Sequence, residues 1–270
     1  MQKNEAEIKN NVKKNYTRIV KEDSGCCCSS SCCGGQQKEE SEVKDLAEKM
    51  DYTDEEINSI FVEANYGLGC GNPGAIADLK KGETVLDLGC GAGFDVFLAA
   101  RKVGGEGKVI GIDMTEAMIE KAESNAAENN IENVEFILGE IENLPIENSS
   151  VDVIISNCVI NLSPNKEKVF SEAKRVLKPG GRLAISDILK EKEFPEEIKS
   201  NLDNYSSCVT GSIEKEKLIS ILEKLEFKNI EIKRKNHSDE IVGDWVSGIN
   251  INNYIYSAYI RAENKLNSKS

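Results

Sequence analysis

Histidine is almost absent from this chain of 270 residues, in which His237 is the only one. Reactions that need a histidine base, and metal sites built from histidine ligands, therefore have almost nothing to work with. Long apolar runs are also missing, because no stretch approaches the roughly eighteen residues of a membrane span. The polar N-terminus, MQKNEAEIKNNVKKNYTRIVKED, lacks the apolar core of a signal peptide. We therefore expect a cytoplasmic protein that does not enter a membrane.

Positive charge is scarce as well. The chain has 34 lysines and arginines against 47 acidic residues, which gives a formal net charge of −13. The basic residues are scattered, and most of them lie beside glutamates, as on solvated helix faces. A field of this sign repels a phosphate backbone unless a local basic patch opposes it. We expect no nucleic-acid partner.

Strand and helix patterns alternate from residue 84 onward. Short apolar runs at 84–89, 107–113, 134–139, 151–157 and 182–188 predict five strands, separated by segments with helical periodicity. The helix after the fourth strand is expected to have Ser163 as its N-cap and Pro164 at its first position. Earlier in the chain, Thr53 and Glu56 predict a capping box before a short helix. Buried strands alternating with helices indicate an α/β fold with a doubly wound, Rossmann-like sheet.

A glycine loop follows the first predicted strand. The segment VLDLGCGAGFD places Gly89, Gly91 and Gly93 between that strand and a helix. Glycines at this point let the backbone turn sharply and approach a ligand at the strand ends. The sixth position of a dinucleotide fingerprint is Phe94 here, so the spacing is G-x-G-x-G instead of G-x-G-x-x-G.

The charges around this loop favour a cationic ligand. Asp87 lies beside the loop, and a pyrophosphate would find no obvious cationic partner there. Asp113 ends the second predicted strand, where its carboxylate can accept both hydroxyls of a ribose. S-adenosylmethionine, with its sulfonium, ammonium and ribose, fits this arrangement. A glycine turn with no ligand is the plain structural alternative.

The glycine loop, Asp113 and the segment LKPGG together resemble class I S-adenosylmethionine-dependent methyltransferases. The resemblance implies that the cofactor is S-adenosylmethionine, with no metal cofactor. It leaves open whether Glu140, Glu142 or the backbone alone binds the adenine. Tyr66 and the helix around Tyr16 are expected to close over the methionine end. The expected cofactor contacts are Asp87, Gly89, Gly91, Gly93, Asp113, Met114, Glu140, Ile141, Asn157 and Tyr66.

Nine cysteines stand in the chain, and in a reducing compartment they are more plausible as ligands or redox groups than as permanent disulfides. Cys158 follows the fourth predicted strand, at the rim where a substrate would meet the cofactor. Cys208 lies in a loop of the C-terminal portion, and Cys70 precedes the first strand. Each one alone can also be a small buried hydrophobe, which is our interpretation of Cys90. Five more, Cys26, Cys27, Cys28, Cys32 and Cys33, form the segment GCCCSSSCCGG.

The segments GLGCGNP, GEIENLP, SNCVINL and CVTG closely resemble the arsenite methyltransferases over nearly the whole chain. The resemblance implies methyl transfer to trivalent arsenic. Arsenic(III) is a soft centre that binds up to three thiolates and keeps a lone pair, and soft thiolate ligands suit such centres. Cys158 and Cys208, with Cys70 as the third ligand, would aim that lone pair at the methyl group. Arsenic needs no general base to become a nucleophile, which suits a chain with one histidine.

Methyl transfer oxidises arsenic, and the family implies that enzyme cysteines then form a disulfide that thioredoxin or glutathione reduces. The resemblance implies a disulfide between Cys70 and a cysteine of the N-terminal cluster, by preference Cys32 or Cys33. The cluster lacks the second spaced pair of a zinc site. We interpret it as an arm of soft ligands that captures arsenite, with a dispensable tail as the alternative.

These expectations divide the chain into three portions. Residues 1–42 form an N-terminal helix and the cysteine-rich arm, and 43–189 form the methyltransferase domain. Residues 190–270 form a smaller α+β portion that binds arsenic and caps the site, and its last strands extend the sheet. We expect a monomer. The alternatives are a methyltransferase of an organic small molecule and a thiol-rich metalloid-binding protein on a methyltransferase scaffold.

Overall fold

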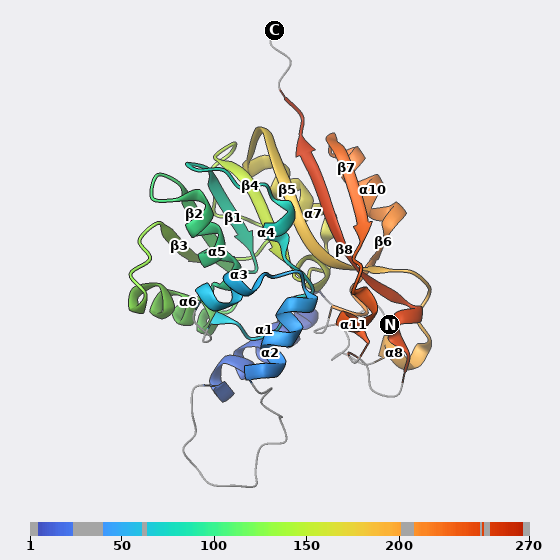
Figure 1. The fold of residues 1–270 in the computed structure, drawn as a ribbon. Coiled ribbons are helices and arrows are strands. Elements are labelled where there is room, and N and C mark those ends of the chain that lie inside the picture. Colours follow the sequence, from blue (N-terminus) through green and yellow to red (C-terminus); the bar gives the residue numbers. More distant parts are fainter. Residues whose placement is uncertain are drawn as a thin grey trace, which may run out of the picture.

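The structure is a computed structural model that describes residues 5–23, 40–60, 64–200, 208–243, 245 and 249–266. One sheet organises this part of the chain (Figure 1), with strand order β3-β2-β1-β4-β5-β8-β7 and with β6 paired to β5 off this path. The strands are β1 (Thr84–Leu88), β2 (Lys108–Asp113), β3 (Val134–Leu138), β4 (Val151–Asn157), β5 (Leu177–Lys190), β6 (Ile213–Glu214), β7 (Phe227–Arg234) and β8 (Ile255–Asn264).

The sheet is parallel from β3 to β5 and becomes antiparallel where the C-terminal strands join it. In the parallel part, Leu86 of β1 lies opposite Ile110 of β2 and Ile154 of β4. β8 pairs antiparallel with both β5 and β7. The last strands therefore extend the sheet, as the sequence predicts.

Helices cover both faces of the sheet. Apolar side chains of α5 and α6 pack on one face, and those of α7 and α10 pack on the other. The doubly wound α/β fold is thereby confirmed. The helices and short 3-10 segments are α1 (Glu5–Asp23), α2 (Glu40–Lys49), α3 (Asp54–Ser59), α4 (Pro73–Ile76), α5 (Phe94–Val103), α6 (Glu116–Glu128), η2 (Ile160–Leu162), α7 (Lys166–Val176), α8 (Glu196–Ser200), α10 (Lys215–Lys224), α11 (Ser238–Val242) and η3 (Ile251–Asn253).

A third apolar cluster lies at the carboxyl ends of the parallel strands. Its buried members include Val12 of α1, Ala47 of α2 and Ile241 of α11, together with three cysteines. Figure 1 shows α1 and α2 across this end of the sheet. The N-terminal helices and the C-terminal segment thus enclose the edge at which this fold binds ligands.

The start of α7 differs from the sequence prediction. Asn165 is its N-cap, and the Asn165 side chain accepts a hydrogen bond from Lys168 N. The hydroxyl of Ser163 donates instead to Glu142 Oε1 at 2.6 Å. Pro164 therefore precedes the helix, because Ser163 is held by a side chain from another loop. The capping box of Thr53 and Glu56 is confirmed.

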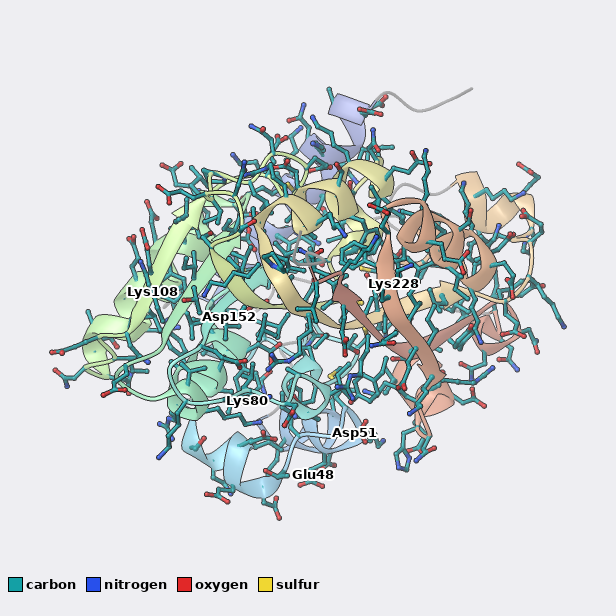
Figure 2. The ribbon with its side chains drawn as sticks, turned by 90° about the horizontal axis from the view of Figure 1, so that it is seen from above. Glu48, Asp51, Lys80, Lys108, Asp152 and Lys228 are labelled. Carbon is teal, nitrogen blue, oxygen red and sulfur yellow. The ribbon has the colours of Figure 1, made fainter. Side chains whose placement is uncertain are left out.

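Charged side chains are distributed over many elements, as the labelled residues in Figure 2 illustrate. They include Glu48 of α2, Lys108 of β2, Asp152 of β4 and Lys228 of β7. Within the described ranges, no helix combines the length and the apolar character needed to cross a bilayer.

Candidate active site

The glycine loop after β1 closes against the end of β2. Gly89 N and Cys90 N both donate to the carbonyl oxygen of Ile112, at 2.7 and 3.0 Å. Gly89 has a φ of +73°, and a Cβ atom there would lie 2.1 Å from Cγ2 of Val159. Glycine is therefore required at this position both for its backbone conformation and for space. Gly93, with φ +98°, is the N-cap of α5.

A cleft extends from this loop in two directions. One part reaches inward to Cys158 and the other runs outward along the loop after β3, and the two parts share Tyr16, Gly89, Asp113 and Val159. The inner part contains the predicted cofactor contacts Tyr66, Asp87, Gly89, Gly91, Asp113 and Asn157. The outer part contains Met114, Glu140 and Ile141. The structure thus brings these predicted residues together, whereas the cleft lining among the described residues does not include Gly93.

Three carboxyl groups, those of the buried Asp87 and Asp95 and the half-buried Asp113, give the inner cleft an acidic character. Burial raises the pKa of Asp87 well above its usual range, and Asp95 and Asp113 raise it further. Burial also raises the pKa of Asp95 to about 6. Asp113 accepts hydrogen bonds from Gly91 N at 3.1 Å and Thr115 N at 2.8 Å. A bound cation would reverse these pKa shifts, because it favours the ionised carboxylates.

Both acidic residues of the segment GEIENLP line the outer cleft. Lys9 of α1 bridges them, with its Nζ 2.8 Å from Glu140 and 3.1 Å from Glu142. Glu142 is buried and accepts from Ser163, whereas the Glu140 side chain is about half exposed. The N-terminal helix is thereby tied to the outer end of the cleft.

The inner cleft reaches Cys158, which belongs to a cluster of three thiols. The Cys158 side chain interacts with the side chains of both Cys70 and Cys208. Cys208 Sγ also donates to the carbonyl oxygen of Cys158 at 2.8 Å. All three residues are almost fully buried, and all three are free thiols. The structure therefore assembles cysteines that are 50 and 88 positions apart from Cys158 in the sequence.

Two of these cysteines have an unusual backbone. Cys158 and Cys208 have positive φ values of +59° and +62°. Residues other than glycine adopt this region rarely, and such positions concentrate at functional sites. At Cys158 the left-handed conformation ends β4 and leads directly into η2.

Asn157 connects the loop of Cys70 to the end of β4. Its Oδ1 accepts from Cys70 N at 2.9 Å, and its Nδ2 donates to the carbonyl oxygen of Gly71 at 2.6 Å. A Cβ atom on Gly69 would lie 2.5 Å from the same Nδ2. The glycines on either side of Cys70 therefore allow the close approach that brings its thiol to Cys158.

Tyr52 and Asp95 complete this network, although neither residue was predicted as part of the site. The Tyr52 hydroxyl donates to Asp95 Oδ1 at 2.7 Å and accepts from Asn157 Nδ2 at 3.0 Å. Tyr52 precedes the Thr53 capping box, and Asp95 stands in the first turn of α5. Their contacts link segments that are far apart in the sequence.

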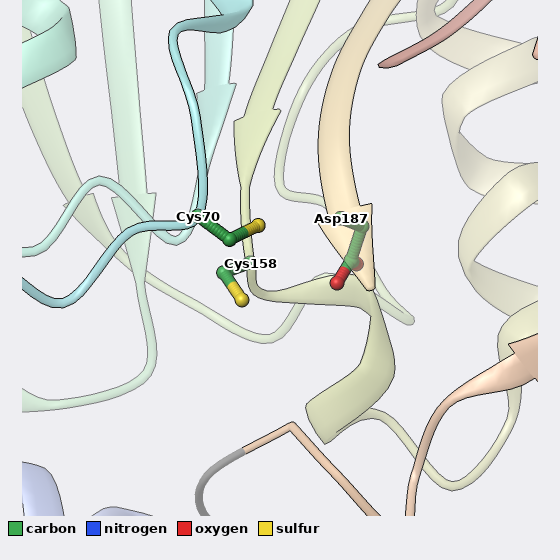
Figure 3. Close-up of side chains that lie close together, drawn as sticks. All are labelled: Cys70, Cys158 and Asp187. Atoms are coloured by element: carbon green, nitrogen blue, oxygen red, sulfur yellow. The ribbon is translucent and has the colours of Figure 1, made fainter. Parts of the chain in front are cut away.

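A carboxylate lies next to the thiols (Figure 3). One ligand atom each from Cys70, Cys158 and Asp187 lies within 4.8 Å of the others. Asp187 comes from β5, where its Oδ1 accepts from Asn161 Nδ2 at 2.8 Å and from Ile188 N at 2.7 Å. Burial raises its pKa to about 6. The segment RLAISDI predicts the strand that carries Asp187 but not this contact.

The surroundings of the thiols favour their protonated form. Burial raises the pKa of Cys158 well above its usual range, and the thiols of Cys208 and Cys70 raise it further. At Cys208 the hydrogen bond with Cys158 lowers the pKa, but burial together with the nearby Asp187 and Cys70 outweighs it, so the pKa is raised. A thiophilic ligand must therefore displace protons when it binds here.

Cys90 lines the inner cleft but is not one of the three clustered thiols. Cys90 is buried in the glycine loop, where its Sγ lies near the Gly91 carbonyl oxygen at 3.6 Å and takes no part in the thiol cluster. Cys26, Cys27, Cys28, Cys32 and Cys33 lie outside the described residues.

Comparisons with known proteins agree with this geometry. A family model described as a methyltransferase domain matches residues 79–226, more than half of the chain. An arsenite methyltransferase of Halobacterium salinarum is 48% identical over 216 residues, which cover 80% of this chain and 55% of that protein. An arsenite methyltransferase of Mus musculus is 37% identical over 67% of this chain and 49% of that protein. The chain thus spans about half the length of these curated relatives.

A solved structure is similar as well. The crystal structure of an arsenic(III) S-adenosylmethionine methyltransferase from Chlamydomonas reinhardtii is 33% identical, with a TM-score of 0.61. The match covers 84% of this chain and 75% of that one. The fold of that protein is therefore also the fold described here.

Proposed function

Because this chain belongs to the methyltransferase family, and within it to the arsenite methyltransferases, we propose that it methylates trivalent arsenic with S-adenosylmethionine. One observation carries the proposal: the cleft built on the glycine loop reaches Cys158, whose thiol contacts those of Cys70 and Cys208. A methyl-donor cleft that ends at three buried thiols suits a thiophilic substrate.

The residues of the cleft fit S-adenosylmethionine. Asp87, Asp95 and Asp113 supply negative charge for its ammonium and sulfonium, and Asp113 stands where a ribose is bound in this fold. Gly89 and Gly91 present backbone without side chains. Met114, Glu140 and Ile141 line the outer part, which we assign to the adenine. When bound, the cofactor supplies the methyl group as an electrophile.

The three cysteines bind and orient the substrate. Each thiol that forms an As–S bond releases its proton to a hydroxyl of arsenite, which leaves as water. Three such bonds hold arsenic as a pyramid, and its lone pair is directed away from the sulfur atoms. Holding that lone pair toward the cofactor cleft is the main catalytic contribution, since positioning can supply about 7–11 kcal/mol. The buried, apolar surroundings exclude water from the site.

Methyl transfer formally oxidises arsenic, and two thiolates can return the electron pair by forming a disulfide. We assign this disulfide to Cys70 and either Cys32 or Cys33, with thioredoxin or glutathione as the external reductant. The assignment rests on the family resemblance, because the N-terminal cysteines lie outside the described residues. We further propose that the protein acts as a cytoplasmic monomer.

One assay tests the proposed function. The purified protein is incubated with arsenite, S-adenosylmethionine and a thiol reductant, and methylated arsenic species are separated over time. Methylated arsenic should accumulate together with S-adenosylhomocysteine. Cofactor turnover that arsenite fails to stimulate would support an organic substrate, whereas arsenite binding without a methylated product would support a metalloid-binding protein.

Cysteine variants test the mechanism. Cys158→Ser and Cys208→Ser should each abolish methylation of both arsenite and monomethylarsonous acid, since both residues are needed to hold either species. Cys70→Ser should lose mainly the first methylation, because a monomethylated arsenic needs only two thiols. The affinity of the Cys70→Ser variant for S-adenosylmethionine, measured by calorimetry, should stay unchanged, and this measurement is the control for folding. A Cys158→Ser variant with full activity would contradict the mechanism.

A further inference from the structure

A buried lysine stands directly behind Cys70. Lys235 follows β7, and its side chain has 0% exposure. Its Nζ donates to the carbonyl oxygen of Cys70 at 3.1 Å and to that of Met50 at 3.3 Å. Lys235 Nζ also lies 3.5 Å from Asp51 Oδ2 and 4.6 Å from the ring centroid of Tyr259. Figure 2 shows Asp51 on the side of the molecule where α2 lies.

Packing alone does not explain a lysine at this position. Burying an ammonium group is costly unless it is paired and hydrogen-bonded, and an apolar side chain of similar length would fill the same space. Among the described residues, its ion-pair partner Asp51 has a side chain that is 41% exposed, and its other contacts include two neutral carbonyls and a ring. What an apolar side chain could not provide are the ion pair with Asp51 and the hydrogen bonds to the carbonyl oxygens of Cys70 and Met50.

The carbonyl oxygen of Cys70 is held from a second side as well. Ser257 of β8 donates to it through Oγ at 2.7 Å. Asn157 accepts from the amide of the same residue at 2.9 Å. Both backbone groups of Cys70 are thus bonded to side chains from distant strands, which leaves its thiol little freedom of position.

The neighbouring glycine shows how close this contact is. A Cβ atom on Gly71 would lie 2.3 Å from Lys235 Nζ and 2.2 Å from Ser186 Oγ. The loop must therefore carry glycine after Cys70 in order to lie against Lys235. The segment GLGCGNP and the lysine, 165 positions apart, form one structural unit.

We propose that Lys235, with Ser257, is a positioning residue that sets Cys70 as the third arsenic ligand and so determines the use of inorganic arsenite. The inference rests on the proposed function, in which arsenite takes three thiols and monomethylarsonous acid takes two. Lys235 acts on the one cysteine that distinguishes these substrates. Its removal should therefore affect the two arsenic species differently.

The test compares Lys235→Met with Lys233→Met. Methionine is unbranched and one atom shorter than lysine, and it removes the donors. Lys233, with a 75% exposed side chain, is the matched control. Binding of arsenite and of monomethylarsonous acid is measured by equilibrium dialysis, and KM and kcat are measured for both. Lys235→Met should weaken arsenite binding about tenfold or more, the size expected for a lost hydrogen bond from a charged donor. Monomethylarsonous acid should bind within about twofold of wild type, as should both species to Lys233→Met.

The second variant, Ser257→Ala, removes a neutral donor to the same carbonyl and should shift arsenite binding in the same direction by a smaller factor. It keeps the proposal testable if Lys235→Met fails to fold. Equal losses for both arsenic species, or unchanged arsenite binding in a folded variant, would overturn the positioning role. A wild-type protein that methylates neither species would instead overturn the proposed function.

Discussion

The loop that carries Cys70 gives the sharpest mutational prediction. In Gly71→Ala the added methyl group would lie 2.2 Å from Ser186 Oγ and 2.3 Å from Lys235 Nζ, whereas ordinary contacts to a Cβ atom begin near 3.4 Å. Either the loop or both side chains must move by roughly 1 Å. Ser186 and Lys235 are both buried, so neither has free space to move into.

The magnitude follows from this overlap. Overpacking of a well-packed interior costs about 1–3 kcal/mol, which corresponds to a decrease in Tm of several degrees in a domain of this size. A displacement of about 1 Å at a reacting group can reduce the rate about a hundredfold. We therefore expect Gly71→Ala to fold with lower stability, to lose most methylation of arsenite, and to keep more of its activity on monomethylarsonous acid.

Thermal unfolding and time-resolved separation of arsenic species measure both effects. Gly105→Ala is the matched control, because nothing lies within 4 Å of its added methyl group and its backbone needs no glycine. If Gly71→Ala equalled Gly105→Ala in stability and in arsenite methylation, the loop would not pass as close to Lys235 and Ser186 as described, and the reasoning would fail.

Two further predictions concern the cofactor cleft. Asp113→Asn should weaken S-adenosylmethionine binding about tenfold or more in calorimetry. The reason is that it removes a charged acceptor, which Gly91 N and Thr115 N hold in place. An unchanged affinity would show that Asp113 does not contact the cofactor. Burial raises the pKa of Asp95 to about 6, and a cationic cofactor binds its ionised form better. The affinity for S-adenosylmethionine should therefore decrease as the pH falls through about 6, and Asp95→Asn should flatten this dependence. A wild-type affinity that is constant between pH 5 and 8 would contradict the prediction.

Local patterns in the sequence were sufficient for much of the fold. The glycine loop, the alternating strands and helices and the capping box of Thr53 each depend on neighbouring residues, so each could be predicted from a short segment. The start of α7 was predicted wrongly because Ser163 bonds to Glu142, 21 positions away, and that contact does not show in the local pattern.

Some residues of the candidate site could likewise be predicted from the sequence, and others could not. Cys70, Cys158 and Cys208 stand in recognisable segments, and their softness toward arsenic is a property of the residue type. Asp95 ends the glycine-loop segment and Asp187 stands in a predicted strand, but no pattern singles out Tyr52, Asp95, Asp187 or Lys235 as site residues. Their importance arises from contacts across the fold, such as that between Tyr52 and Asn157, 105 positions apart.

The sequence by itself determined the fold class, the glycine loop and the set of thiols, because these depend on residue type and short-range spacing. Only the tertiary structure decided which groups surround those thiols. It placed a buried lysine that follows β7 and a serine of β8 on the carbonyl oxygen of Cys70, and a buried carboxylate beside Cys158. The physical reason is that burial and hydrogen-bond geometry depend on how distant segments pack, which no short stretch of sequence encodes.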